Sequence, residues 1–156
     1  MTKTALVTGA TSGIGRAIAL ALANSGYQVL AVGRDLAALA SLKATLGIEP
    51  LALDLTDRSA VQNALQNRSL DVLINNAGMM PPVGHFCDAD QADLDATLAL
   101  NISAVVHLTR LVAPTMRARG QGHIFFTGST AGHTSFPNMA VYCASKAAVS
   151  GFAGAL

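Results

Sequence analysis

Short apolar runs alternate with stretches of helical periodicity along almost the whole chain. The runs do not alternate between apolar and polar residues, as strands do in a sheet with one solvent-exposed face. Continuous apolar runs are typical of strands buried on both faces of a parallel sheet. We expect strands at residues 4–8, 28–32, 51–55, 71–74 and 123–127. Strand and helix alternate throughout, so the pattern predicts a doubly wound α/β domain that occupies residues 1–156 without an internal boundary.

The first two predicted helices each follow one of these strands. Ile14, Ile18 and Leu22 recur at every fourth position and predict one face of a helix. A second helix is expected to begin after Asp35, a good N-cap residue, and to carry leucines through residue 46. Gly47 is the expected stop of that helix.

The second half of the chain predicts longer helices and two loops, at residues 79–86 and 128–138. Thr56 or Asp57 opens a weaker helix, and the segment 79–86 is expected to be a loop because it contains two prolines and a glycine. A long helical region follows, with acidic residues at its start and arginines at its end, as the helix dipole favours. Pro114 is expected to kink or divide this helix, and a last helix begins near Met139.

Composition narrows the class of protein. Of 156 residues, 51% are hydrophobic and 12% charged, and the net charge is +1. This excludes a disordered chain and argues against nucleic-acid binding, which needs clustered positive charge. Two cysteines 56 positions apart form neither a disulfide framework nor a metal pair, and no histidine spacing suggests a metal site.

Mean hydropathy is +0.43, which raises the question of a membrane. The uncharged stretches 17–33 and 121–145 are both interrupted by polar residues, so neither is an apolar span of roughly 20 residues. The expectation is a soluble, cytoplasmic protein without a membrane or nucleic-acid partner.

A glycine-rich turn leaves the first strand and enters the first helix. Gly9, Gly13 and Gly15 have the spacing G-x-x-x-G-x-G. Glycines allow the backbone to approach a bound group, and the N–H groups at a helix start favour a pyrophosphate. The alternative is that three glycines merely close a tight βα turn.

Tyr142 and Lys146 lie four residues apart at the start of the last helix, so they share a face. A neighbouring ammonium favours the phenolate, which suits a tyrosine to acid/base work on an alcohol or carbonyl. By itself the pair is better explained as a half-buried tyrosine beside a solvated lysine.

Two further polar residues accompany this pair. Ser129 follows the fifth strand, where substrates sit in such sheets, and its hydroxyl could hold the oxygen that Tyr142 protonates. It could equally bond the loop backbone. Asn101 interrupts an apolar helical stretch, so its amide either points to solvent or bonds locally and bends the helix.

Together these motifs resemble the short-chain dehydrogenase/reductase family. The family's T-G-x-x-x-G-I-G, N-N-A-G and Y-x-x-x-K motifs stand at residues 8–15, 75–78 and 142–146. The resemblance implies a Rossmann-like sheet of strand order 3-2-1-4-5 and hydride transfer between a nicotinamide and a carbonyl or secondary alcohol, a small molecule. It implies that Tyr142 is the acid/base and that the Ser129 hydroxyl holds the substrate oxygen. It also implies that Lys146 favours the Tyr142 phenolate and binds the nicotinamide ribose. Asn101 would steady a water in a proton relay.

The resemblance also implies a set of cofactor contacts. These are Gly9, Thr11, Ser12, Gly13, Ile14, Gly15, Arg34, Asp54, Leu55, Asn76, Ala77, Gly78, Tyr142 and Lys146. Asp54 corresponds to the family's adenine contact.

Cofactor choice depends on charge after the second strand. Relatives that prefer NAD carry an acid at the position of Gly33, and here Arg34 follows, whose guanidinium can clamp a 2′-phosphate. Asp35 is adjacent, and Ser12 stands where many NADP users have a second basic residue. NADP(H) is favoured and NAD(H) stays open.

Members of the family continue beyond the Tyr/Lys helix through further strands. Relative to them this domain is expected to be incomplete at its C-terminus, leaving 123–127 as an apolar sheet edge. One hypothesis is a dehydrogenase/reductase, a homodimer or homotetramer as in the family. The other is a dinucleotide-binding remnant of weak catalytic power that acts by association with another subunit.

Overall fold

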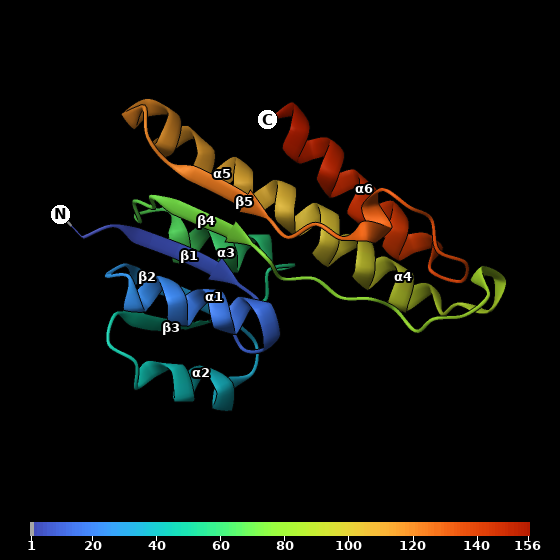
Figure 1. Ribbon diagram of the computed structural model, residues 1–156, viewed down its shortest axis with the longest axis horizontal. Coiled ribbons are helices and arrows are strands. Elements are labelled where there is room, and N and C mark those ends of the chain that lie inside the picture. Colours follow the sequence, from blue (N-terminus) through green and yellow to red (C-terminus); the bar gives the residue numbers. More distant parts are fainter. Residues whose placement is uncertain (1) are drawn as a thin grey trace.

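The computed structural model describes residues 2–156 and is built on one parallel sheet (Figure 1). Five strands lie in the order β3-β2-β1-β4-β5. Their bounds are β1 Thr4–Thr8, β2 Gln28–Gly33, β3 Ile48–Ala52, β4 Val72–Asn75 and β5 His123–Phe126. The predicted Rossmann-like architecture and its strand order are confirmed.

Helices connect successive strands and cover both faces of the sheet. They are α1 Gly13–Asn24, α2 Leu36–Lys43, α3 Arg58–Leu65, α4 Gln91–Leu98, α5 Val105–Arg119 and α6 Ala140–Ala155. Between α4 and α5 the stretch η2, Ala99–Ala104, is π-helical. Short 3₁₀ turns stand at η1, Phe86–Asp88, and η3, Thr130–Gly132.

Two aspartates cap the second and third helices, as their sequence positions predict. The Asp35 carboxylate accepts the Ala38 N–H at 3.0 Å, and the Asp57 carboxylate accepts the Ala60 N–H at 2.9 Å. Asp57, and not Thr56, is therefore the cap of α3.

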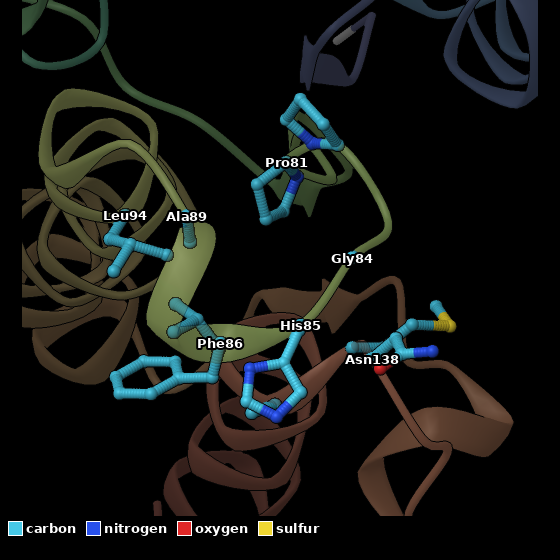
Figure 2. Close-up of a pocket in the computed structure, with 11 residues that line it drawn as sticks. Pro81, Gly84, His85, Phe86, Ala89, Leu94 and Asn138 are labelled. Atoms are coloured by element: carbon cyan, nitrogen blue, oxygen red, sulfur yellow. The ribbon is translucent and has the colours of Figure 1, made fainter.

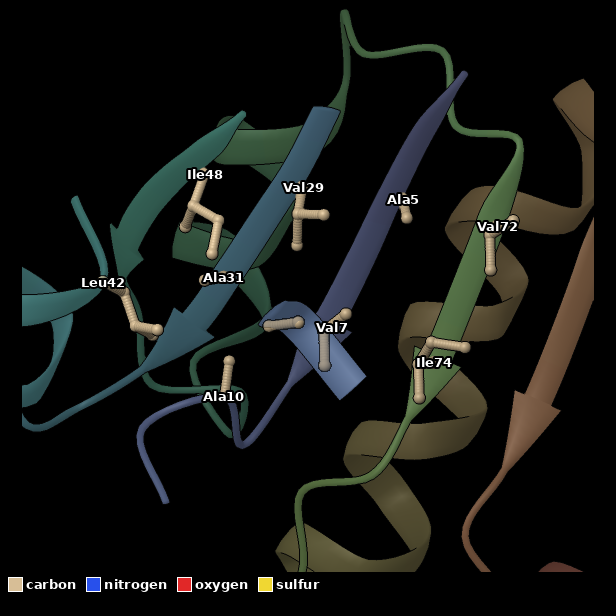
Figure 3. Packing of buried hydrophobic residues seen from close by; sticks show 10 residues of the cluster. Ala5, Val7, Ala10, Val29, Ala31, Leu42, Ile48, Val72 and Ile74 are labelled. Atoms are coloured by element: carbon tan, nitrogen blue, oxygen red, sulfur yellow. The ribbon is translucent and has the colours of Figure 1, made fainter. Parts of the chain in front are cut away.

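Alternate residues of the strands feed two hydrophobic cores. On one face Val7 and Val29 pack with α1 and α2 (Figure 3). On the other, Leu6 and Leu73 pack with α3 and α5. Each such side chain contributes about 1.5–3 kcal/mol when fully buried. Burial on both faces is why the strands read as continuous apolar runs.

The boundaries around β3 differ from the sequence prediction. The strand begins at Ile48, not at residue 51, and includes Pro50. Proline fits here because β3 is an edge strand, where a missing N–H interrupts no second ladder. Helix α2 ends at Lys43, so the prediction that it reaches Leu46 is wrong, and that side chain is 94% exposed.

The apolar face of α1 is shorter than its periodicity predicts. Ile18 and Leu22 pack against the core, whereas Ile14 is 64% exposed. The buried residues of α1 are Gly15 and Ala19. Ile14 lines a cleft described below, so its exposure places an apolar side chain at a surface where a ligand could lie.

The long helical region does not break at Pro114. Helix α5 runs through that residue, and the departure from α geometry lies earlier, in η2. By length and composition alone, Gln91–Arg119 is long and apolar enough to cross a membrane. Its residues Leu108, Val112 and Met116 are instead buried against the sheet, as in the core helix of a globular protein. The uncharged stretches 17–33 and 121–145 do not include this helix.

Strand β5 forms the edge of the sheet opposite β3, as expected. Phe125 is 53% exposed on it. Phe126 makes an edge-to-face contact with Phe152 of α6, with ring centroids 5.8 Å apart, so α6 rests beside this edge strand (Figure 1).

The hydroxyl of Thr8 joins β1 to β4 where both strands end. Its oxygen donates to the Ile74 carbonyl at 3.1 Å and accepts the N–H groups of Asn76 and Ala77 at 2.8 and 2.9 Å. The Asn76 side-chain amide donates back to the Thr8 carbonyl at 2.9 Å. One donor and two acceptor positions fill the capacity of a hydroxyl, and Thr8 is buried.

We expect Thr8→Val to lower the free energy of unfolding by about 1–3 kcal/mol, because the Ala77 N–H loses its acceptor and the Asn76 N–H keeps only the Ile74 carbonyl at 3.1 Å. Thr8→Ser keeps the hydroxyl and should cost about 1 kcal/mol or less. Urea denaturation of the two variants measures the difference. Equal losses in both would mean that the methyl group, and not the hydroxyl, matters.

Candidate functional site

A cleft of about 880 Å³ opens at the carboxyl ends of the strands. This is where open α/β sheets bind ligands. All but one of the predicted site residues line it: Gly9, Thr11, Ser12, Gly13, Ile14, Gly15, Arg34, Asp54, Leu55, Asn76, Ala77, Gly78, Ser129, Tyr142 and Lys146. The exception is Asn101, which lies behind the cleft wall and is 2% exposed.

The glycine turn has a geometry that other residues could not adopt. Gly9 and Gly13 have φ angles of +65° and +49°, in the left-handed region. A Cβ on Gly15 would overlap the Gly9 carbonyl oxygen and the Asn76 side-chain nitrogen. A Cβ on Gly13 would meet nothing within 4 Å. Gly15 is thus required for packing, while Gly13 leaves its backbone open to the cleft.

Helix α1 begins inside the cleft without a side-chain cap. The Ser12 side chain makes no capping hydrogen bond. The first N–H groups of a helix have no partner within the helix, and they carry its positive dipole end. An anionic group in the cleft would satisfy them, and a pyrophosphate suits this place.

Two charged side chains, Arg34 and Asp54, line the cleft after β2 and β3. Arg34 follows β2 and extends toward Asp54, with Nη1 3.9 Å from a carboxylate oxygen. The pKa of Asp54 is held below its ordinary value, first by the Thr56 N–H, then by the Thr56 hydroxyl, with Arg34 adding a smaller effect. Asp35 does not line the cleft, because its carboxylate caps α2.

Lys146 is buried beneath the floor of the cleft. It is 7% exposed, so the alternative of a solvated lysine is wrong. Its Nζ donates to the Thr127 carbonyl at 2.9 Å and stands 5.9 Å from the centroid of the Tyr142 ring. Burial lowers the pKa of Lys146 below its ordinary value. The ammonium therefore lies close to a phenol in a place where charge is poorly solvated.

Ser129 has one of the two roles that its sequence position left open, the bond to the loop backbone. Its hydroxyl oxygen accepts the Ala131 N–H at 3.1 Å at the start of η3, and the residue also lines the cleft. Gly132 brings η3 onto α6, because a Cβ there would stand 2.9 Å from the Lys146 carbonyl oxygen. The serine and the Tyr/Lys helix are therefore held as one unit.

Asn101 neither points to solvent nor bonds only within its own helix. Its Oδ1 accepts the Met79 N–H at 2.8 Å, and its Nδ2 donates to the Met79 carbonyl at 2.8 Å. This two-way bond fixes the backbone just after Gly78. A Cβ on Gly78 would stand 3.2 Å from Asn101 Oδ1 and 3.7 Å from Lys146 Nζ.

Three polar residues that sequence reasoning did not single out support the site. Thr8 ties the ends of β1 and β4, Thr127 supplies the carbonyl that holds Lys146, and Ser145 contacts Asn101. Thr8 and Ser145 stand inside the motifs quoted above, and Thr127 lies two residues before Ser129. That adjacency was the available signal, but the partners come from distant segments.

A second, smaller pocket of about 230 Å³ lies outside the cleft (Figure 2). It is bounded by the loop after Met80 and by the start of α6, and it shares no lining residue with the cleft. Gly84 N–H donates to the Asn138 carbonyl at 3.2 Å and joins its two sides. His85 belongs to this pocket, where its Nδ1 accepts the Cys87 N–H at 3.3 Å.

Comparison with known proteins agrees with this geometry. The family model described as short chain dehydrogenase matches residues 3–156. An uncharacterized short-chain type dehydrogenase/reductase of Sinorhizobium fredii is 51% identical over 99% of this chain and 62% of its own length. An NADP-dependent 3-hydroxy acid dehydrogenase of Salmonella typhi is 38% identical over 94% of this chain and 62% of its own.

A solved structure has the same arrangement. The closed form of serine dehydrogenase complexed with NADP⁺ superposes with a TM-score of 0.92 at 35% identity, over 96% of this chain and 63% of that one. The chain thus spans somewhat less than two thirds of the length of these relatives. With a family match over 154 residues, the glycine turn in place and the Tyr/Lys pair in the same cleft, the chain belongs to the short-chain dehydrogenase/reductase family.

Proposed function

We propose that this protein is an oxidoreductase that transfers a hydride between NADP(H) and a carbonyl or secondary alcohol, with Tyr142 as acid/base. The observation that carries the proposal is the buried ammonium of Lys146, held by the Thr127 carbonyl next to the Tyr142 ring in the cleft. A buried charge near a phenol that can exchange a proton, in a cleft, is typical of a catalytic site. A purely structural lysine would be expected in solvent.

The cleft residues fit a dinucleotide. The uncapped start of α1 and the exposed backbone of Gly13 would hold the pyrophosphate, and Asp54 would contact the adenine end. Gly78 leaves space beside Lys146 for the nicotinamide ribose. The bound nicotinamide supplies or accepts the hydride.

The protein's own groups handle the proton. Tyr142 would donate a proton to the carbonyl oxygen in reduction and remove it in oxidation, and the Ser129 hydroxyl would hold that oxygen. Lys146 stabilises the phenolate that forms when the tyrosine gives up its proton. Asn101 would hold the cleft segment after β4 in place through its two bonds to the Met79 backbone.

NADP(H) is favoured over NAD(H) by the charges after β2. Arg34 is the cationic side chain there, and it is exposed on the cleft wall, where it can meet a 2′-phosphate. The acid beside it, Asp35, is occupied in capping α2. The Salmonella relative is named as NADP-dependent, and the serine dehydrogenase holds NADP⁺. Assembly into dimers or tetramers stays a prediction from the family resemblance, and a cytoplasmic location stays a prediction from composition.

We expect Tyr142→Phe to reduce NADPH-dependent turnover of a ketone and aldehyde panel by about 10²–10⁴-fold, because the proton donor is lost. The affinity for NADPH should change by less than about threefold, since the ring remains. NADPH absorbance at 340 nm follows turnover, and fluorescence titration gives the affinity.

Tyr27→Phe is the matched control. Tyr27 is the only other tyrosine and packs against the core beside α1, away from the cleft. It should keep turnover unchanged. NADPH binding by the unaltered chain without turnover over the whole panel would contradict the enzyme and favour the dinucleotide-binding remnant.

Arg34→Ala should weaken NADPH binding by about 10–100-fold and leave NADH binding within about threefold, because only the 2′-phosphate loses its charge-assisted partner. Arg110→Ala removes an exposed arginine outside the cleft and serves as the control for net charge. Equal weakening of both cofactors by Arg34→Ala would assign the arginine a general electrostatic role.

The buried charge of Lys146 predicts a dependence of stability on pH. Burial lowers its pKa, so the folded chain releases this proton at a lower pH than the unfolded chain, whose value is near 10.5. The penalty for the buried charge is complete below the folded pKa and is relieved as pH rises toward 10.5. We expect Lys146→Met to gain stability relative to the unaltered chain at pH 7 and to lose part of that gain at pH 10.

Urea denaturation at the two pH values measures this change. Lys43→Met, at an exposed position, should show the same difference from the unaltered chain at both. A gap for Lys146→Met that is constant or widens toward pH 10 would mean that the lysine is not desolvated.

A further inference from the structure

A chain of hydrogen bonds runs behind the cleft wall and ends on the backbone of Tyr142. Met79 is bonded in both directions to the Asn101 carboxamide, at 2.8 Å each. The same Nδ2 donates to Ser145 Oγ at 3.0 Å, and that hydroxyl donates to the Tyr142 carbonyl at 2.8 Å. The chain thus connects the loop after β4 with the first turn of α6.

The directions of these bonds leave no alternative arrangement. The Ser145 hydroxyl has one proton, which the Tyr142 carbonyl accepts, so toward Asn101 it can only be an acceptor. The Asn101 amide nitrogen then uses one proton on Ser145 and the other on the Met79 carbonyl, and its oxygen takes the Met79 N–H. Ser145 is 0% and Asn101 2% exposed, so water cannot replace either partner.

These bonds link the two sides of the cleft. Gly78 and Met79 line the cleft after β4, while Tyr142 and Lys146 line it from α6, on either side of Ser145. The π-helical turn η2 carries Asn101 into the gap between them. Small displacements of a reacting group cost rate, so a rigid link here bears directly on proton transfer.

We infer that Ser145 is a positioning residue for the reaction proposed above: its hydroxyl locks Tyr142 in α6 to the cofactor wall at Met79 through the Asn101 amide. It touches neither substrate nor cofactor. The inference rests on the proposed function and gives Ser145 a role distinct from that of Asn101, which clamps Met79 directly.

The two links predict a split between turnover and cofactor affinity. Ser145→Ala keeps both bonds between Asn101 and Met79, so NADPH affinity should stay within about threefold while turnover falls about tenfold or more. Asn101→Ala removes the clamp as well, so affinity and turnover should both fall.

Thr97→Val is the matched control. Thr97 is also a 0% exposed hydroxyl, and its oxygen donates only to the Asp93 carbonyl of its own helix, at 2.7 Å. Its loss should reduce stability as Ser145→Ala does and leave turnover unchanged.

A spectroscopic readout makes the test independent of turnover. The chain has two tyrosines and no tryptophan, so in a Tyr27→Phe background the tyrosine band of the near-ultraviolet circular dichroism spectrum reports Tyr142 alone. We expect this band to weaken about twofold or more in Ser145→Ala, because the ring is held less firmly in α6. Thr97→Val should leave the band unchanged.

The outcomes separate the inference from the proposed function. An unaltered chain that neither binds nor oxidises NADPH would overturn the proposed function, and the circular dichroism band would still decide whether Ser145 positions Tyr142. Turnover and a tyrosine band in Ser145→Ala that match those of Thr97→Val would overturn the inference while the enzyme stands.

Discussion

The buried hydroxyl of Thr8 is the contact on which the geometry of the cleft depends. It accepts two consecutive N–H groups after β4 and thereby sets where that segment leaves the sheet. The Asn76 amide, bonded to the Thr8 carbonyl, occupies the space that a side chain on Gly15 would need. The glycine turn and the wall after β4 are thus placed relative to each other before any ligand is present, and the entropy of ordering them is spent in folding.

Similar hydrogen bonds hold the part of the cleft that follows β5. Small hydroxyl and amide groups satisfy one another across segments far apart in sequence, as Thr127 does with Asn76 at 3.2 Å. Neutral polar groups that are fully bonded carry a modest cost of burial, whereas a charge in the same place would cost much more. The framework of the site is therefore neutral, and its one buried charge stands where the proposed chemistry needs it.

Much of the fold could be predicted because its signals are local. Runs buried on both faces identify parallel strands, and an aspartate before an apolar helix identifies a cap, as Asp35 and Asp57 do. Strand order followed from the family resemblance, not from periodicity. The residues of the cleft could be named because the family resemblance implies them, including Arg34, Asp54 and Leu55, which belong to none of the three quoted motifs.

The sequence predictions that the structure contradicts concern residues whose conformation or burial depends on a partner far away in the sequence. The predicted third strand begins only after Pro50, but the edge position of β3 admits this proline. Pro114 reads as a break, yet the helix departs from α geometry at η2, where Asn101 reaches across to Met79 and Ser145. Ile14 has the period of a core residue and lies in the cleft instead. None of these partners is within one helical turn in sequence, so no window of the sequence contains the information.

The buried position of Lys146 is the strongest physical reason to regard the cleft as catalytic. Removing an ammonium from water costs several kcal/mol, and a single carbonyl, that of Thr127, repays only part of it. No carboxylate in the described residues 2–156 forms a salt bridge with this lysine. A chain selected only for stability would gain from an apolar residue at this position, as with other buried charges. A phenol that must exchange its proton at neutral pH gains instead from an unneutralised charge nearby, because a carboxylate partner would cancel the field that stabilises the phenolate. The unfavourable burial and the absence of a counter-charge are therefore both accounted for by the proposed role of Tyr142 in proton transfer.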